Sequence, residues 1–175
     1  MPDSVSPVSD PARYQAMLLN LAGPGDPAIS TEATASELQA LVVEAGDRLR
    51  NRPAPGEWSV LELIGHIVDA EMVSSTRLRW VLAQERPDLP GYEQDDWVSA
   101  LHHNDADPGA LIATFEVLRA ANVALWRSTP IALRSRIGVH RERGDESFEL
   151  IFRLLAGHDR FHINQARATL AELRD

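Results

Sequence analysis

The sequence predicts an all-α protein, a four-helix bundle with a short N-terminal extension. Four long segments repeat their apolar residues at helical spacing, and capping signals precede two of them. Patterns typical of β-strands are scarce, and SRIGVH at 135–140 is the single short candidate. Four amphipathic helices of this length are typical of a bundle. We expect an extension at 1–30 that is partly flexible, and a bundle domain at 31–175.

Local signals place the extension and the first two bundle helices. Residues 1–10 are rich in Pro, Ser and Asp and are expected to be mobile, whereas RYQAMLLNLAG is expected to form a short helix. The first bundle helix is expected at 33–51. The second is expected at 59–84, because SVLE matches a capping box in which Ser59 caps the helix and Glu62 reaches back to the open backbone amide.

The third and fourth bundle helices follow a long connection. The third is expected from Asp107, a good N-cap that is followed by Pro108 at the first helical position, to about residue 130. The fourth is expected at 145–173. The connection at 86–106 is long, and long connections within a compact domain are often functional or crossover segments.

Composition narrows the function classes. The chain has 175 residues, no cysteine and a formal net charge of −9. The lack of cysteine excludes disulfides, thiolate ligands and a cysteine nucleophile, and the acidic balance disfavours nucleic-acid binding. The first residues do not resemble a signal peptide, and no apolar run approaches the roughly 20 residues that span a bilayer. We expect a cytoplasmic protein that binds neither nucleic acid nor a membrane.

Two histidines lie where the fourth helix should face the core. In GHDRFHINQ at 157–165, His158 and His162 are one turn apart on the apolar stripe. His66 lies on the apolar stripe of the second helix, so three inward histidines on two helices could converge. A single inward histidine is usually a core residue, but two adjacent rings need four hydrogen-bond partners or a metal ion. Bundle cores are a usual place for metal sites.

Two familiar metal patterns fit HDRFH poorly. A zinc protease would have His-Glu-x-x-His with glutamate as the general base, but Asp159 holds the second position here. An HD-type phosphohydrolase needs a further metal-binding aspartate well downstream. The only later aspartate is Asp175, the terminal residue.

A third pattern fits better. EWSVLELIGHIVDAE at 57–71, followed by GHDRFHINQ near the far end, resembles the DinB/YfiT-like metal-binding superfamily, over about residues 33–173. The resemblance implies a four-helix bundle with up-down-down-up connectivity, in which the long connection is the crossover between the second and third helices. It implies metal ligation by His66, His158 and His162. It also implies a homodimer.

The resemblance leaves three functions open. Members of this superfamily include S-transferases that use bacillithiol or mycothiol, a mycothiol-dependent maleylpyruvate isomerase and hydrolase-like proteins. The leading hypothesis is a metal-dependent transferase in which a three-histidine divalent ion activates a low-molecular-weight thiol for attack on an electrophile. The alternatives are a hydrolase that uses metal-bound hydroxide and a non-catalytic, stress-related metal-binding bundle. Zinc or nickel are the expected metals, and iron or manganese also accept imidazole.

Other polar residues are candidates for supporting roles. Asp159 could orient an imidazole from its distal nitrogen, or be a solvated or ion-paired carboxylate. Gln165, one turn beyond His162, could face the cavity or cap a buried polar group. Trp58 is expected to be a packing anchor. Asp69, one turn beyond His66, could approach the site or form a surface pair with Glu71. Arg141 and Arg143 could receive a carboxylate substrate or belong to a charged turn. The remaining histidines are expected at the surface or at a pocket rim: His102, His103 and His140.

Overall fold

The structure is a computed structural model that describes residues 10–174, and the mobility expected for residues 1–9 lies outside this part of the chain. The helices are α1 (Pro11–Ala22), α2 (Pro27–Thr31), α3 (Thr34–Ala45), α4 (Val60–Ala83), α5 (Gln94–Ala100), α6 (Pro108–Ser128) and α7 (Phe148–Glu172). The strands are β1 (Asp88–Leu89), β2 (Ile137–His140) and β3 (Gly144–Ser147).

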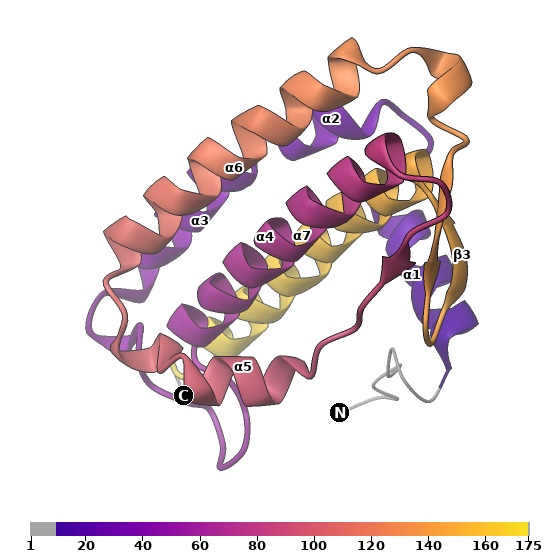
Figure 1. The fold of residues 1–175 in the computed structure, drawn as a ribbon. Coiled ribbons are helices and arrows are strands. Elements are labelled where there is room, and N and C mark those ends of the chain that lie inside the picture. Colours follow the sequence, from indigo (N-terminus) through magenta and orange to yellow (C-terminus); the bar gives the residue numbers. More distant parts are fainter. Residues whose placement is uncertain (1–9, 175) are drawn as a thin grey trace.

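Four of the helices form a bundle in which α4 and α7 lie side by side (Figure 1). α3 and α7 run in one direction and α4 and α6 in the other, which confirms the predicted up-down-down-up order. The connection from α4 to α6 returns along the whole bundle and carries β1 and α5. α4 and α7 therefore bring their inward faces together along most of their length.

Helix bounds follow the predicted caps, with two exceptions. Ser59 and Glu62 form the reciprocal capping box that the sequence predicts for α4. α3 ends earlier than expected, because Gly46 adopts a positive φ of 52° and a short 3₁₀ turn follows. α7 begins at Phe148, capped by the Ser147 side chain. The residues just before it, expected to be helical, form β3 instead.

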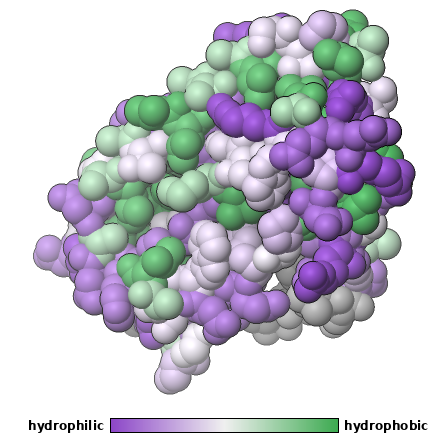
Figure 2. Space-filling model, in the orientation of Figure 1, coloured by the Kyte–Doolittle hydropathy of each residue, from purple (hydrophilic) through white to green (hydrophobic). Residues whose placement is uncertain are grey.

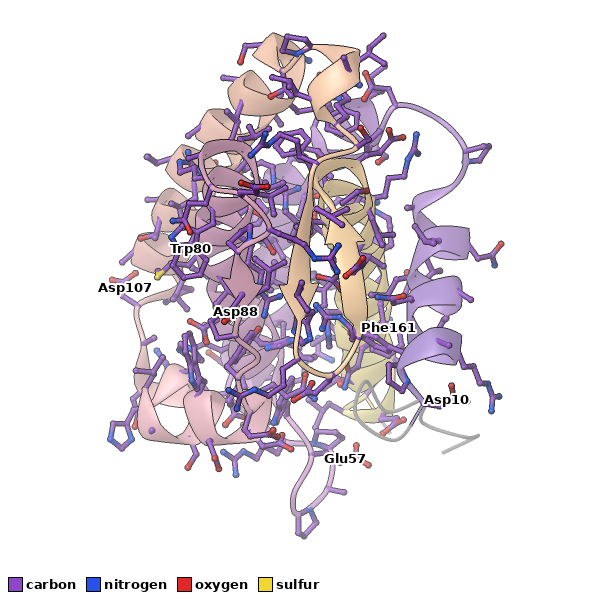
Figure 3. All side chains as sticks on the ribbon, turned by 45° about the vertical axis from the view of Figure 1, so that its right-hand side comes forward. Asp10, Glu57, Trp80, Asp88, Asp107 and Phe161 are labelled. Carbon is purple, nitrogen blue, oxygen red and sulfur yellow. The ribbon has the colours of Figure 1, made fainter. Side chains whose placement is uncertain are left out.

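A small sheet joins the start of the crossover to the start of α7. Its order is β1-β2-β3, with β1 parallel to β2 and β2 antiparallel to β3. β2 lies in the one predicted strand segment, whereas β1 and β3 were not predicted. β1 is two residues long and β3 reads GDES, so neither carries an apolar alternation. Figure 3 shows the β2–β3 hairpin in front of α7, with α1 beside it.

α1 packs directly on α7. Tyr14 and Leu18 of α1 form an apolar cluster with Leu154 of α7. The two backbones approach closely at Gly157, where an added Cβ would lie 2.0 Å from the Leu18 carbonyl oxygen. A glycine is therefore required at 157 for α1 to cover the segment that precedes His158.

α6 is the most exposed bundle helix. Its length, and a mean hydropathy of 1.3 over 18 of its residues, would also suit a membrane span, although Glu116, Arg119 and Asn122 interrupt its apolar run. Its inward face nevertheless carries polar Arg119 and Asn122 beside Phe115 and Trp126. Figure 2 shows apolar patches among polar surface on the side of the molecule seen in Figure 1. This pattern fits an outer helix of the bundle, buried on one side only.

Candidate metal centre

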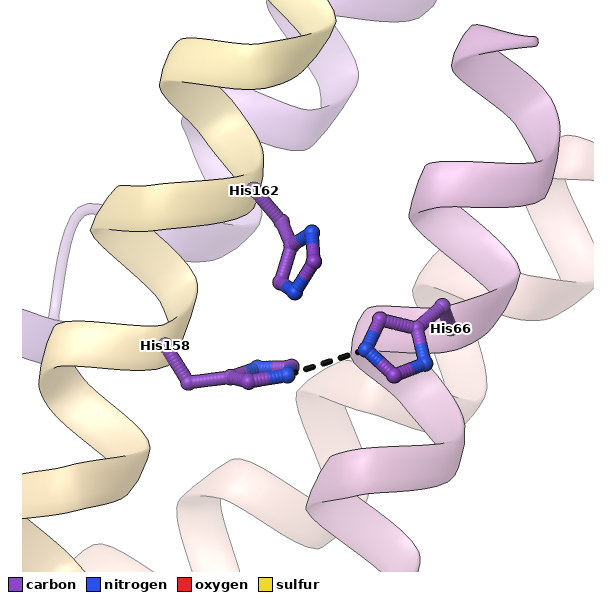
Figure 4. Close-up of side chains that lie close together, drawn as sticks. All are labelled: His66, His158 and His162. Carbon is purple, nitrogen blue, oxygen red and sulfur yellow. Dashed lines mark hydrogen bonds between the residues drawn. The ribbon is translucent and has the colours of Figure 1, made fainter. Parts of the chain in front are cut away.

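Three histidine side chains meet between α4 and α7. His66 projects from α4, and His158 and His162 project from successive turns of α7 (Figure 4). The Nε2 atoms of His66 and His158 are 3.0 Å apart, and one nitrogen from each of the three rings lies within 4.8 Å of the others. The structure thus brings together all three histidines that the sequence singled out.

The nitrogens of the triad fit a metal ion. The Nε2 atoms of His66 and His158 meet only each other, and His162 Nε2 is buried without a hydrogen-bond partner among the described residues (Figure 4). Leaving a buried nitrogen unsatisfied costs about 1–3 kcal/mol, so nitrogens that meet only one another indicate a missing ligand. Tetrahedral zinc with nitrogens at about 2.0–2.1 Å would place the three Nε2 atoms roughly 3.4 Å apart, close to the 3.0 Å between the first two.

Burial keeps the three rings neutral. Desolvation lowers the pKa of His66 and of His158 well below the ordinary value, and the neighbouring histidines lower both further. Desolvation also lowers the pKa of His162 to about 4, against the opposing effect of its hydrogen bond to Gln165. Neutral imidazole is the form that binds a metal, so the site is ready to bind one at pH 7 without losing protons.

Gln165 fixes the orientation of one ring. Its Oε1 accepts a hydrogen bond from His162 Nδ1 at 2.9 Å. A neutral imidazole protonated at Nδ1 presents an unprotonated Nε2. A partner on the distal nitrogen is the usual support for a metal-ligating histidine. Trp58 lies beside the triad, with its ring centroid 5.0 Å from that of His66, and also packs against the main core.

Asp159 faces away from the triad. It is fully buried, and its Oδ2 accepts hydrogen bonds from Arg119 Nη1 at 2.6 Å and from Thr34 Oγ1 at 3.0 Å. Arg119 also contacts Glu71 Oε2 at 2.6 Å. No histidine contacts Asp159 among the described residues, so the ion-paired alternative describes it.

Several polar residues expected at the surface are buried. Asp69 Oδ2 lies 2.7 Å from His103 Nε2, and both side chains are buried. The His103 ring occupies the space that a side chain at position 65 would need, and Gly65 leaves it free. Glu71 is buried against Arg119, and His140 lies in the sheet with its ring buried beside Arg77. The surface prediction was wrong for these residues, because their partners are distant in the sequence.

A cavity of about 230 Å³ adjoins the triad and is lined by His66 and His158. Its walls come from α1, α4, α7, the segment after β1 and the β2–β3 hairpin. The apolar part of the lining consists of Leu18, Ala70, Val73, Ile151, Leu154 and Leu155. Its polar part includes Arg143, which the sequence analysis named, and Tyr14, Tyr92 and Arg77, which it did not. Arg77 lies eleven residues after His66, on the same helical face, and that spacing was the available signal.

The fold and this centre define a class: a helical bundle with a three-histidine group that could hold a metal ion beside an open cavity. The comparisons name it. The family model of the DinB superfamily matches residues 30–166, which is most of the chain, and the protein belongs to this superfamily.

Several relatives carry a metal-dependent description. "Putative metal-dependent hydrolase YfiT" of Bacillus subtilis is 28% identical over 97 residues, which are 55% of this chain and 54% of YfiT. A protein of Geobacillus thermodenitrificans with the same description is 31% identical over 61 residues, 34% of each chain. One from Bacillus cereus is 25% identical over 61% of each chain. The chain thus matches between a third and about three fifths of the length of these relatives.

A solved structure agrees in fold. YfiT from Bacillus subtilis, described as "a probable metal-dependent hydrolase with an unusual four-helix bundle topology", has a TM-score of 0.76 and 20% sequence identity. The match covers 99% of this chain and 93% of that one. At this identity the likeness supports the bundle topology alone.

Proposed function

We propose that the protein is a metal-dependent enzyme in which His66, His158 and His162 hold a divalent ion and which transfers a small thiol to an electrophile. The observation that carries the proposal is the cavity, which reaches two of the three histidines. A structural metal site is closed by protein ligands, whereas a catalytic site keeps a position open for substrate. Zinc and nickel suit a three-imidazole site, and iron or manganese are further candidates.

The chain's own groups prepare the site. An ion at the triad would supply a Lewis acid that lowers the pKa of a thiol or a water molecule beside it. Gln165 holds His162 with Nε2 free. Tyr92, whose ring centroid lies 6.5 Å from that of His66, lines the cavity, and burial raises the pKa of its phenol. It therefore stays a hydrogen-bond donor toward whatever binds there.

The surroundings of the triad favour a thiol over water. The acidic residues nearest in sequence to the three histidines are already occupied: Asp69 contacts His103, and Asp159 contacts Arg119. Neither is free to act as a general base. A thiol has an ordinary pKa of about 8.5 against about 15.7 for water, so it needs less help to lose its proton. The absence of cysteine means that the thiol would arrive with a substrate.

Hydrolysis is the second candidate, and the names of the relatives favour it. In that case water would take the place of the thiol in the cavity. The third hypothesis, a non-catalytic stress-related bundle, is less well supported, because a merely stabilising ion needs no cavity beside it.

Cobalt substitution tests the proposal at its first step. Protein purified without a histidine tag is loaded with cobalt and titrated with 2-mercaptoethanol. We expect a sulfur-to-metal charge-transfer band, and the lack of cysteine ensures that its sulfur comes from the added thiol. The His158→Ala variant should not develop the band, whereas the His102→Ala variant, which changes an exposed histidine, should.

Turnover then separates the two chemistries. With 1-chloro-2,4-dinitrobenzene as electrophile, the metal-loaded protein should speed formation of the thioether, with release of chloride and a proton. A cobalt spectrum that no thiol changes would refute the transferase. Metal-dependent ester hydrolysis that His158→Ala abolishes, in a protein whose spectrum ignores thiols, would establish the hydrolase instead.

A further inference from the structure

Two arginines are buried among the described residues, and they differ in their partners. Arg119 is 6% exposed and contacts two carboxylates at 2.6 Å, which raise its pKa. Arg77 is 7% exposed, yet no carboxylate of the described chain lies within ion-pair distance of it. Burial lowers the pKa of Arg77. A desolvated cation without a bound anion is costly, so this residue needs a reason to be kept.

Arg77 lines the same cavity as the triad. It lies eleven residues after His66 on α4, about 16 Å along the helix axis at a rise of about 1.5 Å per residue. Side chains lean toward the N-terminus of their helix, and the longer arginine reaches further in that direction than the histidine, so the guanidinium lies closer to the His66 ring along the axis than the two Cα atoms do. A molecule with its reacting group at the triad could therefore reach Arg77 through a short chain.

One nitrogen of the Arg77 guanidinium is fixed by two partners, and the other two nitrogens have none among the described residues. Nη2 donates to the Pro90 carbonyl oxygen and lies 3.2 Å from His140 Nε2. Nε is sealed from solvent and without a partner among the described residues. Nη1 makes no hydrogen bond to the described residues either, and it is not among the sealed atoms, while the side chain lines the cavity. The group is thus fixed in place and presents a free donor.

The acidic residues nearby do not neutralise Arg77 directly. Glu146 is buried, but its carboxylate is bound by Arg143 at 2.6 Å and by Gln15 at 3.1 Å. Glu142 also lines the cavity and is exposed, as are Glu93 and Asp95. These exposed carboxylates would repel a strongly charged anion such as a polyphosphate, but they leave room for one negative charge at the buried end.

We propose that Arg77 is the anchor for a carboxylate on the small molecule whose other end reacts at the triad. The proposal rests on the function proposed above and names the substrate class. A guanidinium offers a planar set of donors that matches a carboxylate and binds it more strongly than a neutral acceptor. The cavity of about 230 Å³ suits a small organic acid. The carboxylate can belong to the thiol or to the electrophile.

Calorimetry on the metal-free, full-length protein tests the anchor without the triad. The probes are 3-phenylpropionate and the uncharged 3-phenylpropan-1-ol. We expect the wild type to bind the acid at least tenfold more tightly than the alcohol. Arg77→Met should remove this preference and leave the affinity for the alcohol unchanged, and Arg77→Lys should keep part of it. Arg79→Met is the matched control, since Arg79 lies on the same helix, outside the cavity lining.

A second titration locates the carboxylate. Cobalt-loaded protein is titrated with 6-mercaptohexanoate and with 6-mercaptohexan-1-ol. If the carboxylate belongs to the thiol, the acid should change the spectrum at a concentration at least tenfold lower, and Arg77→Met should abolish the difference. If the carboxylate belongs to the electrophile, the two thiols should act equally while the calorimetric preference remains.

Three outcomes are decisive. Equal affinity of the acid and the alcohol for the metal-free wild type would overturn the anchor. So would an acid preference that survives in Arg77→Met protein with native circular dichroism. Arg77→Met strands no carboxylate, so we expect it to fold. A cobalt spectrum that neither thiol changes would overturn the proposed thiol function and leave the calorimetric result standing.

Discussion

Two buried polar clusters lie in this bundle, and they differ in how their charges and hydrogen bonds are met. In the ionic cluster of Arg119, Glu71 and Asp159, each charged group contacts one of opposite sign at 2.6 Å. Arg119 Nε and Asp159 Oδ1 have no partner among the described residues, but every charge in this cluster is paired. In the histidine triad, the Nε2 atoms of His66 and His158 meet only each other and His162 Nε2 meets no partner among the described residues. The first cluster is neutralised by its own residues, whereas the second lacks a ligand.

The two clusters are adjacent in sequence. His158 and Asp159 are consecutive, but successive residues of a helix point about 100° apart. His158 therefore faces α4 and the cavity, while Asp159 faces Arg119 of α6 and Thr34 of α3. The difference shows that the His-Asp pair combines two tasks: the histidine serves the site, and the aspartate joins three helices.

The largest expected effect comes from breaking the ionic cluster. Arg119→Met leaves Glu71 and Asp159 buried without their cation, and removing one partner of a buried pair costs about 3–5 kcal/mol. We expect the free energy of unfolding, measured in urea, to fall by that amount. As a control, Arg127→Met breaks an exposed pair with Glu32 and should cost at most about 1 kcal/mol. Equal losses in the two variants would contradict the difference between buried and exposed pairs.

Substitutions in the triad should weaken metal binding more than they weaken folding. Changing His66, His158 or His162 to alanine should lower metal affinity at least about 100-fold, roughly 2.7 kcal/mol, because each removes one of three ligands. The stability of the metal-free protein should change much less than in Arg119→Met. Competition with a chelator of known affinity measures the first effect, and urea unfolding of the metal-free variants measures the second. Unchanged zinc affinity in any of the three would remove that histidine from the site.

Local signals in the sequence were enough for one cluster and not for the other. The capping box at Ser59 and the apolar stripes placed α4 and α7 closely enough to turn three histidines inward. The partners of Asp159 lie 40 and 125 positions away. No periodicity links such distant residues, so the ionic cluster could not be predicted from local pattern.

Contacts between residues that are distant in the sequence also explain the wrong predictions around the cavity. His140 and His103 are buried because they contact Arg77 and Asp69 of α4, which lie 63 and 34 positions away in the sequence. β1 and β3 form through backbone pairing between short segments without apolar alternation. Arg77 is a cavity residue that was missed although the sequence held a signal for it, because its spacing from His66 puts a charged side chain on an inward face.

The buried histidines should make the stability of the metal-free protein depend on pH. Burial lowers the pKa of the three triad histidines, and it lowers the pKa of His140 to about 4. The unfolded chain, with histidine pKa values near 6.5, takes up these protons first as the pH falls. Stability should therefore decrease from about pH 6.5 toward pH 4, by up to about 1.4 kcal/mol per pH unit for each histidine.

Urea unfolding at several pH values measures this slope. Replacing all three triad histidines by glutamine removes their titration and should flatten the profile, leaving the contribution of His140. A wild-type stability that stays constant between pH 6.5 and 4.5 would show that the triad is hydrated and titrates normally.

The smallest expected effect concerns the hydrogen bond that joins the triad to Gln165, the one that its rings make to another side chain of the described residues. Gln165→Leu keeps the approximate size of the side chain but removes the acceptor for His162 Nδ1–H. The ring would then lose the partner that keeps Nε2 unprotonated, and partners of this kind contribute about 10–100-fold to metal affinity. We expect zinc affinity to fall about tenfold, with helical circular dichroism unchanged. Gln165→Glu supplies a stronger acceptor at the same position and should restore the affinity, whereas equal weakening by both variants would show that Gln165 acts through packing and not through the hydrogen bond.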